Sequence, residues 1–304
     1  MIIKPRYESK ELKLYRILNR RMELSAEEVQ HYWSLEKGYE GELQFDAWLA
    51  GLPGTENWLV LNDLLLECNH STFQIDSLLV VDGTLYFFEV KNYEGDFYID
   101  GNGRWLTISK KEIKNPLLQL ERSESLLRQL LQNLGMHALI EPYIIFINPN
   151  FQLYQAPLCQ PIIFPTQLQR FSKKLPIKLA NRKSIKIVEK LMSIYLKESP
   201  YKRIPEYTHE QVGKGIICKY CCSCKLQFAD HILVCPKCSC KEGIKTAVIR
   251  NIEEFILLFP DRKVTTNAIF EWCEVNTSKK AIRKVLSENY ICIGNGKSSY
   301  YVKS

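Results

Sequence analysis

The sequence predicts an α/β core followed by two small C-terminal modules. Between about residues 38 and 150, apolar runs of strand length alternate with amphipathic helical patterns, which is typical of an α/β fold. Seven of the eleven cysteines lie within residues 218–240. Residues 246–304 then show three helical patterns followed by two short strand patterns. These three observations indicate more than one folded module.

The composition is that of a globular protein. The chain has 304 residues, of which 46% are hydrophobic and 25% charged, which is enough for two domains or for one domain with small appendages. No apolar run approaches the roughly 18 residues that cross a membrane, and the N-terminus lacks the apolar core of a signal peptide. We therefore expect a cytoplasmic protein without a membrane partner.

The net charge of +7 hides an asymmetry between the two halves of the chain. Residues 1–160 hold 15 Lys and Arg against 22 Asp and Glu, whereas residues 161–304 hold 26 against 12. Lys and Arg side chains set against phosphates release counterions, so a basic half favours a polyanion, and we expect DNA as the partner. An acidic half is expected where carboxylates hold a cation.

Helical spacing of Leu12, Tyr15 and Leu18 predicts a helix over residues 8–33. A second helix is expected from about residue 39 to the turn at Gly51-Leu52-Pro53-Gly54. Apolar runs predict strands at residues 58–66, 73–81, 84–91, 96–99 and 142–148. Amphipathic patterns predict helices at residues 116–134 and 181–197. The first of these is entered through Asn115-Pro116, since proline suits a first helical turn.

The segment that points to chemistry is a predicted hairpin. Asp82-Gly83 separates two apolar strands and indicates a two-residue turn, because both central residues need a positive φ. Such a turn sets the register, so that Asp76 faces Glu89 and Gln74 faces Lys91 on one side of the strand pair. Opposed Cβ atoms lie about 4.5–5.5 Å apart. Two carboxylates at that distance repel each other unless a cation lies between them.

Carboxylate oxygens suit Mg²⁺ or Mn²⁺, so Asp76 and Glu89 are candidate metal ligands. Lys91 could orient or deprotonate an attacking water, or stabilise the charge of a phosphoryl transition state. Glu42 opens a helix whose apolar residues Phe45 and Trp48 should pack on the sheet. Its carboxylate can then point at the same metal.

Taken together, these residues resemble the nuclease-related domain (NERD), a branch of the PD-(D/E)xK nuclease superfamily. The resemblance covers about residues 1–170. The matching motifs are Gly41-Glu42, Phe73-Gln74-Ile75-Asp76, Glu89-Val90-Lys91-Asn92 followed by Gly95, and Asn115-Pro116-Leu117-Leu118-Gln119. The resemblance implies a restriction-endonuclease-like fold, in which helices flank a mixed central sheet. It also implies that Asp76 and Glu89 bind the metal, that Lys91 is the catalytic lysine and that Glu42 is an auxiliary acid. Gln119 matches a polar position on the following helix.

The resemblance implies a metal-dependent nuclease that hydrolyses DNA phosphodiester bonds. Two other hypotheses stay open. The chain could be a catalytically inactive nuclease-like module that binds nucleic acid, or a DNA-binding regulator whose N-terminal domain senses a ligand. The intact set of two acids and a lysine favours the enzyme.

The cysteine cluster runs Cys218-x-x-Cys221-Cys222-x-Cys224 and, after ten residues, Cys235-x-x-Cys238-x-Cys240. Two CxxC knuckles joined by a short hairpin are typical of a tetrahedral Zn²⁺ site, and clustered cysteines without an export signal favour metal binding over disulfides. We predict a structural zinc bound by Cys221, Cys224, Cys235 and Cys238. Cys218 with Cys221 is the rival first knuckle, Cys222 could also replace a ligand, and His231 is an alternative ligand. Isolated cysteines are usually buried, so we expect core positions for Cys68, Cys159, Cys273 and Cys292.

Residues 246–304 predict a winged-helix-like DNA-binding domain. A first helix covers about residues 252–258, and the polar triplets 265–267 and 276–278 can cap a second and a third. A turn at Gly294-Asn295-Gly296 joins two final strands. The third helix carries four basic residues on one side, suited to phosphates and bases: Lys279, Lys280, Arg283 and Lys284. A solvated face on a protein-interaction domain is the alternative.

The expected domain order follows from these patterns. It is a nuclease-like domain at residues 1–197, a linker at 198–216, a zinc-ribbon-like module at 217–243 and the winged-helix-like domain at 246–304.

Overall fold

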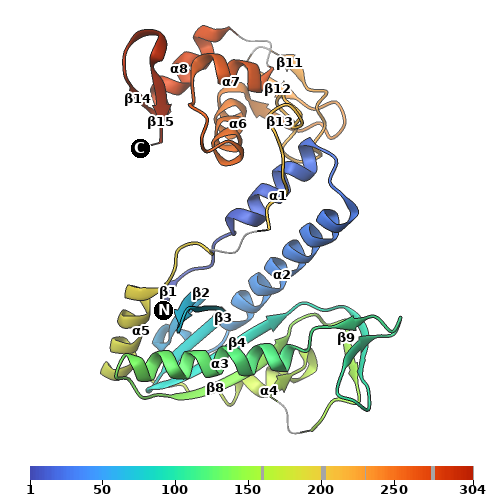
Figure 1. Ribbon diagram of the computed structural model, residues 1–304, viewed down its shortest axis with the longest axis vertical. Helices are drawn as coiled ribbons and strands as arrows, with labels where there is room; N and C mark the ends of the chain where they lie inside the picture. The colour runs from blue at the N-terminus through green and yellow to red at the C-terminus, as the bar shows by residue number, and fades with distance from the viewer. Residues whose placement is uncertain (159–160, 200–202, 230, 275–277, 304) are drawn as a thin grey trace. The chain divides into compact units, whose positions relative to one another are not determined.

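The computed structural model describes the chain (Figure 1) except for residues 159–160, 200–202, 230, 275–277 and 304. Packing divides it into two units. Unit 1 comprises Met1–Glu8 and Trp33–Lys202, and unit 2 comprises Ser9–Tyr32 and Arg203–Ser304. The expected domain 1–197 therefore differs from unit 1 at its N-terminal side, because apolar residues of the helix that follows residue 8 pack in the core of unit 2.

A six-stranded mixed sheet forms the centre of unit 1, in the order β1-β2-β3-β4-β8-β10. Strands β2, β3 and β4 run antiparallel to one another, whereas β1, β8 and β10 join by parallel pairing. A smaller sheet has the order β7-β6-β5-β9. The strands of unit 1 are β1 (Ile2–Lys4), β2 (Leu59–Cys68), β3 (Ser71–Val81), β4 (Thr84–Lys91), β5 (Gly95–Ile99), β6 (Trp105–Thr107), β7 (Glu112–Ile113), β8 (Leu139–Phe146), β9 (Phe151–Tyr154) and β10 (Ile162–Ile163).

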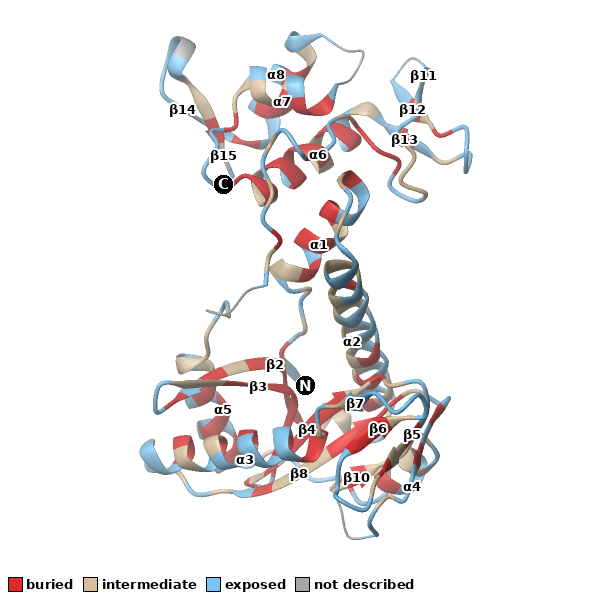
Figure 2. Cartoon of the chain, turned by 45° about the vertical axis from the view of Figure 1, so that its right-hand side comes forward, coloured by how far each residue is buried: buried red, intermediate tan, exposed pale blue. Residues whose placement is uncertain are grey.

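Helices cover both faces of the central sheet. α3 (Pro116–Asn133) and α5 (Arg182–Ile194) pack on one face, and α4 (Leu168–Ser172) with the later part of α2 (Ala26–Ala50) packs on the other. Successive residues of β3 enter the two cores in turn: Leu78 and Val80 face α3, whereas Leu79 and Val81 face α2. A sheet buried on both faces explains the nearly continuous apolar runs of its strands, which Figure 2 shows as buried. The predicted mixed α/β core is confirmed.

The N-terminal helices differ from the prediction. A helix over residues 8–33 was expected, but α1 (Lys10–Arg21) ends early and α2 begins at Ala26. Ser25 and Glu28 form a capping box: Ser25 N donates to Glu28 Oε2 at 2.7 Å, and Glu28 N donates to Ser25 Oγ at 3.3 Å. Such a box starts a new helix. The two internal glycines of α2, Gly38 and Gly41, concealed that one helix runs from residue 26 through the predicted second helix, since glycine disfavours a helix interior.

The β3–β4 hairpin keeps its predicted register from the turn to Ser77↔Phe88, whereas the predicted pairs Asp76–Glu89 and Gln74–Lys91 lie beyond the last regular pair. Asp82 and Gly83 have φ values of 50° and 78°. The pairs run from Val81↔Thr84 to Ser77↔Phe88. The turn chemistry of two residues was therefore enough to align these two strands.

Unit 2 contains helices α1, α6 (Ile244–Leu258), α7 (Thr266–Cys273) and α8 (Lys279–Asn289). Its strands form a three-stranded and a two-stranded sheet: β11 (Gln227–Ala229), β12 (Ile232–Val234) and β13 (Lys241–Gly243), then β14 (Ile291–Ile293) and β15 (Tyr300–Val302). The Thr265 hydroxyl caps α7 and the Ser278 hydroxyl caps α8, as expected, while residues 276 and 277 of the predicted cap lie outside the described residues.

Two further expectations need correction. Much of the predicted linker 198–216 belongs to unit 2, because Val212 and Ile216 are buried in its core. Cys292 is exposed rather than buried, since every residue of the short strand β14 is exposed. Cys68 and Cys273 are buried as predicted, and Cys159 lies outside the described residues. None of the described helices has the length and apolar character that crossing a bilayer requires.

Candidate active site and metal centre

One cavity in unit 1 is lined by all five candidate catalytic residues. Its volume is about 370 Å³. The side chains come from α2, β3, β4 and α3, and they are Glu42, Asp76, Glu89, Lys91 and Gln119. The structure therefore brings together residues that the sequence spreads over nearly eighty positions.

Asp76 lies where the regular ladder of β3 and β4 ends. The last regular pair is Ser77↔Phe88, and Asp76 Oδ2 then accepts a hydrogen bond from Val90 N at 2.8 Å. A side-chain oxygen thus satisfies a backbone donor that would otherwise need a ladder partner. The expected pair of Asp76 and Glu89 is replaced by this contact, which holds the Asp76 carboxylate at the end of the ladder.

Glu89 is buried, with 1% of its surface exposed. Its Oε1 accepts from Lys91 Nζ at 2.7 Å and from Gln119 Nε2. Its Oε2 is buried and has no hydrogen-bond partner within the described residues. Leaving a buried carboxylate oxygen without a partner costs free energy. Such an atom fits the inner shell of a divalent cation.

Gln119 links the two charged residues of β4. Its Nε2 donates to Glu89, while its Oε1 accepts from Lys91 Nζ at 3.1 Å. Gln119 lies in the first turn of α3, which begins with Pro116 and is capped by Asn115 Oδ1. The cap therefore helps to set the position of a side chain in the cavity.

The acidic side chains of the cavity disfavour one another's ionised forms. Burial, followed by the charge of Asp76, raises the pKa of Glu42 to about 8 and that of Glu89 to about 7. Burial also raises the pKa of Asp76. For Lys91, burial lowers the pKa, but Glu89 and Asp76 outweigh it and raise the pKa to about 12. A divalent cation would stabilise the ionised carboxylates.

Arg6 is a residue of this region that the sequence analysis missed. Its Nη1 donates to Glu42 Oε2 at 2.7 Å, and its Nη2 donates to the Asp76 carbonyl oxygen at 2.7 Å. Nε and Nη2 donate to the two oxygens of Asp46 at 2.9 and 3.1 Å. Arg6 precedes Glu42 by 36 positions and belongs to no motif, so no local pattern could have identified it.

Gly41 allows α2 to approach the end of β4. A Cβ atom at this position would lie 2.4 Å from Asn92 Cβ. Asn92 is itself held from two sides: its Nδ2 donates to Lys37 O at 2.8 Å, and its Oδ1 accepts from Asn148 Nδ2 at 3.0 Å. This close contact brings Glu42, the next residue of α2, to the cavity.

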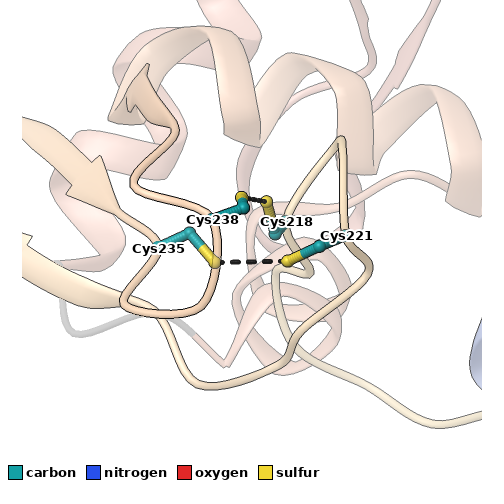
Figure 3. Close-up of side chains that lie close together, drawn as sticks. All are labelled: Cys218, Cys221, Cys235 and Cys238. Atoms are coloured by element: carbon teal, nitrogen blue, oxygen red, sulfur yellow. Dashed lines mark hydrogen bonds between the residues drawn. The ribbon is translucent and has the colours of Figure 1, made fainter.

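Four cysteines of unit 2 form a candidate metal centre (Figure 3). Their sulfur atoms lie within 4.8 Å of one another. The Cys218–Cys238 and Cys221–Cys235 sulfur distances are 3.6 and 3.4 Å, near the roughly 3.8 Å expected for thiolates about 2.3 Å from a tetrahedral Zn²⁺. Within the described part of the chain, no other set of three or more Cys, His, Asp or Glu side chains is as close, and Cys222 and His231 are not in it.

The structure groups Cys218, rather than the predicted Cys224, with Cys221, Cys235 and Cys238, which is the arrangement of the rival first knuckle. Cys224 is exposed and outside the set. The two knuckles share one backbone geometry: Cys222 N donates to Cys218 O at 3.1 Å, and Ser239 N donates to Cys235 O at 2.8 Å. Cys222 and Ser239 both have a positive φ. Cys218 therefore corresponds to Cys235 as the first residue of its knuckle.

The four basic residues on one side of α8 do not all line the same cavity. Lys279, Lys280 and Arg283 line a cavity of about 720 Å³ together with the start of α7 and the turn between β14 and β15. Lys284 is not among the lining residues, and its Nζ lies 3.9 Å from Glu288 Oε1. Three of the four predicted nucleic-acid-binding residues thus share one groove.

Unit 1 combines a mixed central sheet, flanking helices and one cavity that is lined by Glu42, Asp76 and Glu89. Residues 37–147 match the family model described as "Nuclease-related domain" (NERD), so the family expected from the motifs is confirmed over this segment. The matched stretch contains all five predicted catalytic residues and excludes Arg6.

No curated protein matches the chain. A solved structure titled "Crystal Structure of Protein of Unknown Function AF1548" is similar at 10% identity, covering 83% of this chain and 95% of that one. Its TM-score is 0.24, which is too low to bear on the fold or the function.

Proposed function

We propose that unit 1 is a metal-dependent nuclease that hydrolyses DNA phosphodiester bonds. The observation that carries this proposal is the convergence of two buried acids and a lysine in one cavity, with Glu89 Oε2 lacking a hydrogen-bond partner within the described residues. A nuclease-related family match over the same residues supports it.

Asp76 and Glu89 would hold Mg²⁺ or Mn²⁺, with Glu42 as an auxiliary acid. When bound, such a cation supplies Lewis-acid catalysis and activates water. Lys91, whose pKa is raised to about 12, is a cation at neutral pH. Its ammonium group therefore donates hydrogen bonds to the phosphoryl oxygens and stabilises negative charge in the transition state. Gln119 orients this ammonium group relative to Glu89.

The test is cleavage of circular DNA by the full chain with Mg²⁺ or Mn²⁺, comparing Asp76→Asn and Lys91→Ala with the wild type. Asp82→Asn and Lys178→Ala are matched controls, because these residues form an exposed ion pair of 2.8 Å at the hairpin turn. Asn also tolerates the positive φ of position 82.

Metal-dependent cleavage that survives in both controls and is lost in both site variants is the expected result. Wild-type protein that binds DNA but cleaves neither single- nor double-stranded substrates would instead support a catalytically inactive binding module.

DNA binding by unit 2 is a second part of the proposal, and the basic groove on α8 favours it. Lys280→Ala and Arg283→Ala should each weaken binding and reduce the salt dependence of the association constant by about 0.9 in log–log slope. Lys284→Ala is the control, because its side chain does not line the groove. Equal effects of all three substitutions would indicate a diffuse basic surface. The cysteine set would hold a structural Zn²⁺, since four thiolates leave no open position for chemistry.

A further inference from the structure

The β2–β3 ladder is interrupted beside Asp76. Asn62 pairs with Ser77 and Leu64 pairs with Ile75, but the intervening position is skipped. Asp63 has a φ of 53°, a conformation that takes its peptide groups out of a regular ladder. Carbonyl groups at this point need other donors.

Two basic side chains of the N-terminal segment supply those donors. Lys4 is the last residue of β1, which lies on the edge of the central sheet, and its Nζ donates to the carbonyl oxygens of Asn62 at 2.7 Å and Asp63 at 2.6 Å. Arg6, two residues further on, donates to the carbonyl oxygen of Asp76 at 2.7 Å. The segment thus satisfies the backbone on both sides of the interruption.

The guanidinium group of Arg6 is held in one orientation. Asp46 accepts two of its hydrogen bonds and is not among the residues that line the cavity. Its two other hydrogen bonds go to Glu42 and to the Asp76 carbonyl group, both of which belong to residues that line the cavity. Four of the five guanidinium donors are therefore used, and the side chain is 2% exposed. Asp46 thus holds the guanidinium group of Arg6 in place, and this group in turn holds Glu42 and the main chain of Asp76.

We infer that Arg6 is a positioning residue of the proposed metal site, and that it holds the main chain of Asp76 and the carboxylate of Glu42 in place. This inference rests on the proposed function. Removing a group that orients a metal ligand typically lowers metal affinity by about 10- to 100-fold. The packing of Met1–Glu8 within unit 1, outside the segment of the family match, agrees with it.

The experiment measures Mn²⁺ binding to the full chain by calorimetry, without DNA and below the unfolding temperature of each variant. Arg6→Gln should weaken Mn²⁺ binding by about tenfold or more. Arg6→Lys should give a smaller loss, because lysine keeps the charge but not the planar fork. Arg104→Gln is the matched control, since Arg104 forms an exposed ion pair with Asp100, and its affinity should equal that of the wild type.

A double-mutant cycle separates positioning from general destabilisation. If Arg6 acts through Glu42, Arg6→Gln should cost less Mn²⁺ affinity in a Glu42→Gln background than in the wild type. A loss of stability alone would leave the two effects additive, and additive effects would overturn the part of the inference that concerns Glu42.

The outcomes separate this inference from the nuclease proposal. Folded Arg6→Gln with wild-type Mn²⁺ affinity overturns the role of Arg6; if that variant does not fold, folded Arg6→Lys with wild-type affinity does so instead. Mn²⁺ binding that is lost in Asp76→Asn, in a protein that cleaves no DNA, contradicts the nuclease proposal alone. A wild-type protein that binds no Mn²⁺ at this cavity overturns both.

Discussion

The two carboxylate oxygens of Glu89 lie in different surroundings. Oε1 accepts hydrogen bonds from Lys91 and Gln119, whereas Oε2 is buried with no partner within the described residues. Asp76 adds a second buried carboxylate, which raises the free energy of the ionised pair. Without a metal, the cavity therefore favours the protonated form of these carboxyl groups over the ionised form.

Metal affinity and stability should consequently respond to pH in opposite directions. Burial and Asp76 raise the pKa of Glu89 to about 7 and of Glu42 to about 8, against the ordinary 4.5, with Lys91 and Arg6 opposing the shifts. The folded chain then binds more protons than the unfolded chain. In the metal-free protein, the contribution of these two groups to the free energy of unfolding therefore falls as pH rises from about 4.5 to 8.

Protons compete with the cation over the same range. We expect Mn²⁺ affinity to increase as pH rises from about 6 to 8, measured by calorimetry, while the thermal unfolding temperature of the metal-free protein decreases. An Mn²⁺ affinity that stays constant across this range would contradict the assignment of Glu89 as a ligand.

A substitution at Gly41 tests how closely α2 packs against Asn92. Gly41→Ala places a Cβ 2.4 Å from Asn92 Cβ, so α2 must shift, and we expect unit 1 to lose about 1–3 kcal/mol of stability in urea unfolding. Gly38→Ala is the matched control one turn earlier, because a Cβ there meets nothing within 4 Å, and it should be neutral or stabilising by up to about 1 kcal/mol. Equal effects of the two substitutions would argue against the tight contact.

At the scale of elements, the candidate metal centre depends on two short knuckles with the same backbone conformation. Each has a residue of positive φ directly after its second cysteine, Cys222 after Cys221 and Ser239 after Cys238. The repeated geometry, rather than the spacing of cysteines alone, selects the four sulfur atoms that converge.

The knuckle geometry predicts which cysteine matters for zinc. Cys218→Ser should lower the bound zinc of the purified chain well below one equivalent and destabilise the β11–β13 region, because it removes one of four converging thiolates. Cys224→Ser should keep its zinc, since Cys224 is exposed and outside the set. Metal analysis by mass spectrometry distinguishes the two, and zinc retained in Cys218→Ser but lost in Cys224→Ser would restore the original ligand prediction.

At the scale of the whole molecule, unit 2 is assembled from two separate parts of the chain. Arg21 of α1 donates through Nε to Glu254 Oε2 at 2.9 Å, and through Nη1 to the carbonyl oxygens of Gly213 and Gly215 at 2.9 and 3.0 Å. Its side chain is 1% exposed, and its guanidinium lies 4.6 Å from the Trp272 ring centroid. The buried Arg21 side chain thus connects α1 with α6, with α7 and with residues 213–215, which precede the cysteine set.

Removal of this cation should weaken unit 2 selectively. Arg21→Ala breaks a buried ion pair, which typically costs about 3–5 kcal/mol, so we expect faster hydrogen exchange in peptides of α1 and α6–α8. Peptides of β3 and β4 should keep their protection. Arg20→Ala, at an exposed position of the same helix, should change neither. Equal loss of protection in β3 and β4 would show that the two units unfold together.

The features that the sequence determined by itself are those encoded over a few residues. Asp82-Gly83 set the hairpin register, Asn115-Pro116 set the start of α3, and nearly continuous apolar runs identified the strands of a sheet buried on both faces. These patterns were sufficient to place Asp76, Glu89 and Lys91 near one another, because turn geometry and strand periodicity act locally.

Other features were decided only by tertiary packing. The contacts of Arg6 with Glu42 and Asp76, the approach of Gly41 to Asn92, the choice of Cys218 over Cys224 and the membership of α1 in unit 2 all join residues that no local pattern connects. Their positions depend on which distant surfaces fit and which buried polar groups find partners. These contacts depend on the free energy of the whole folded chain, so a local sequence pattern could not predict them.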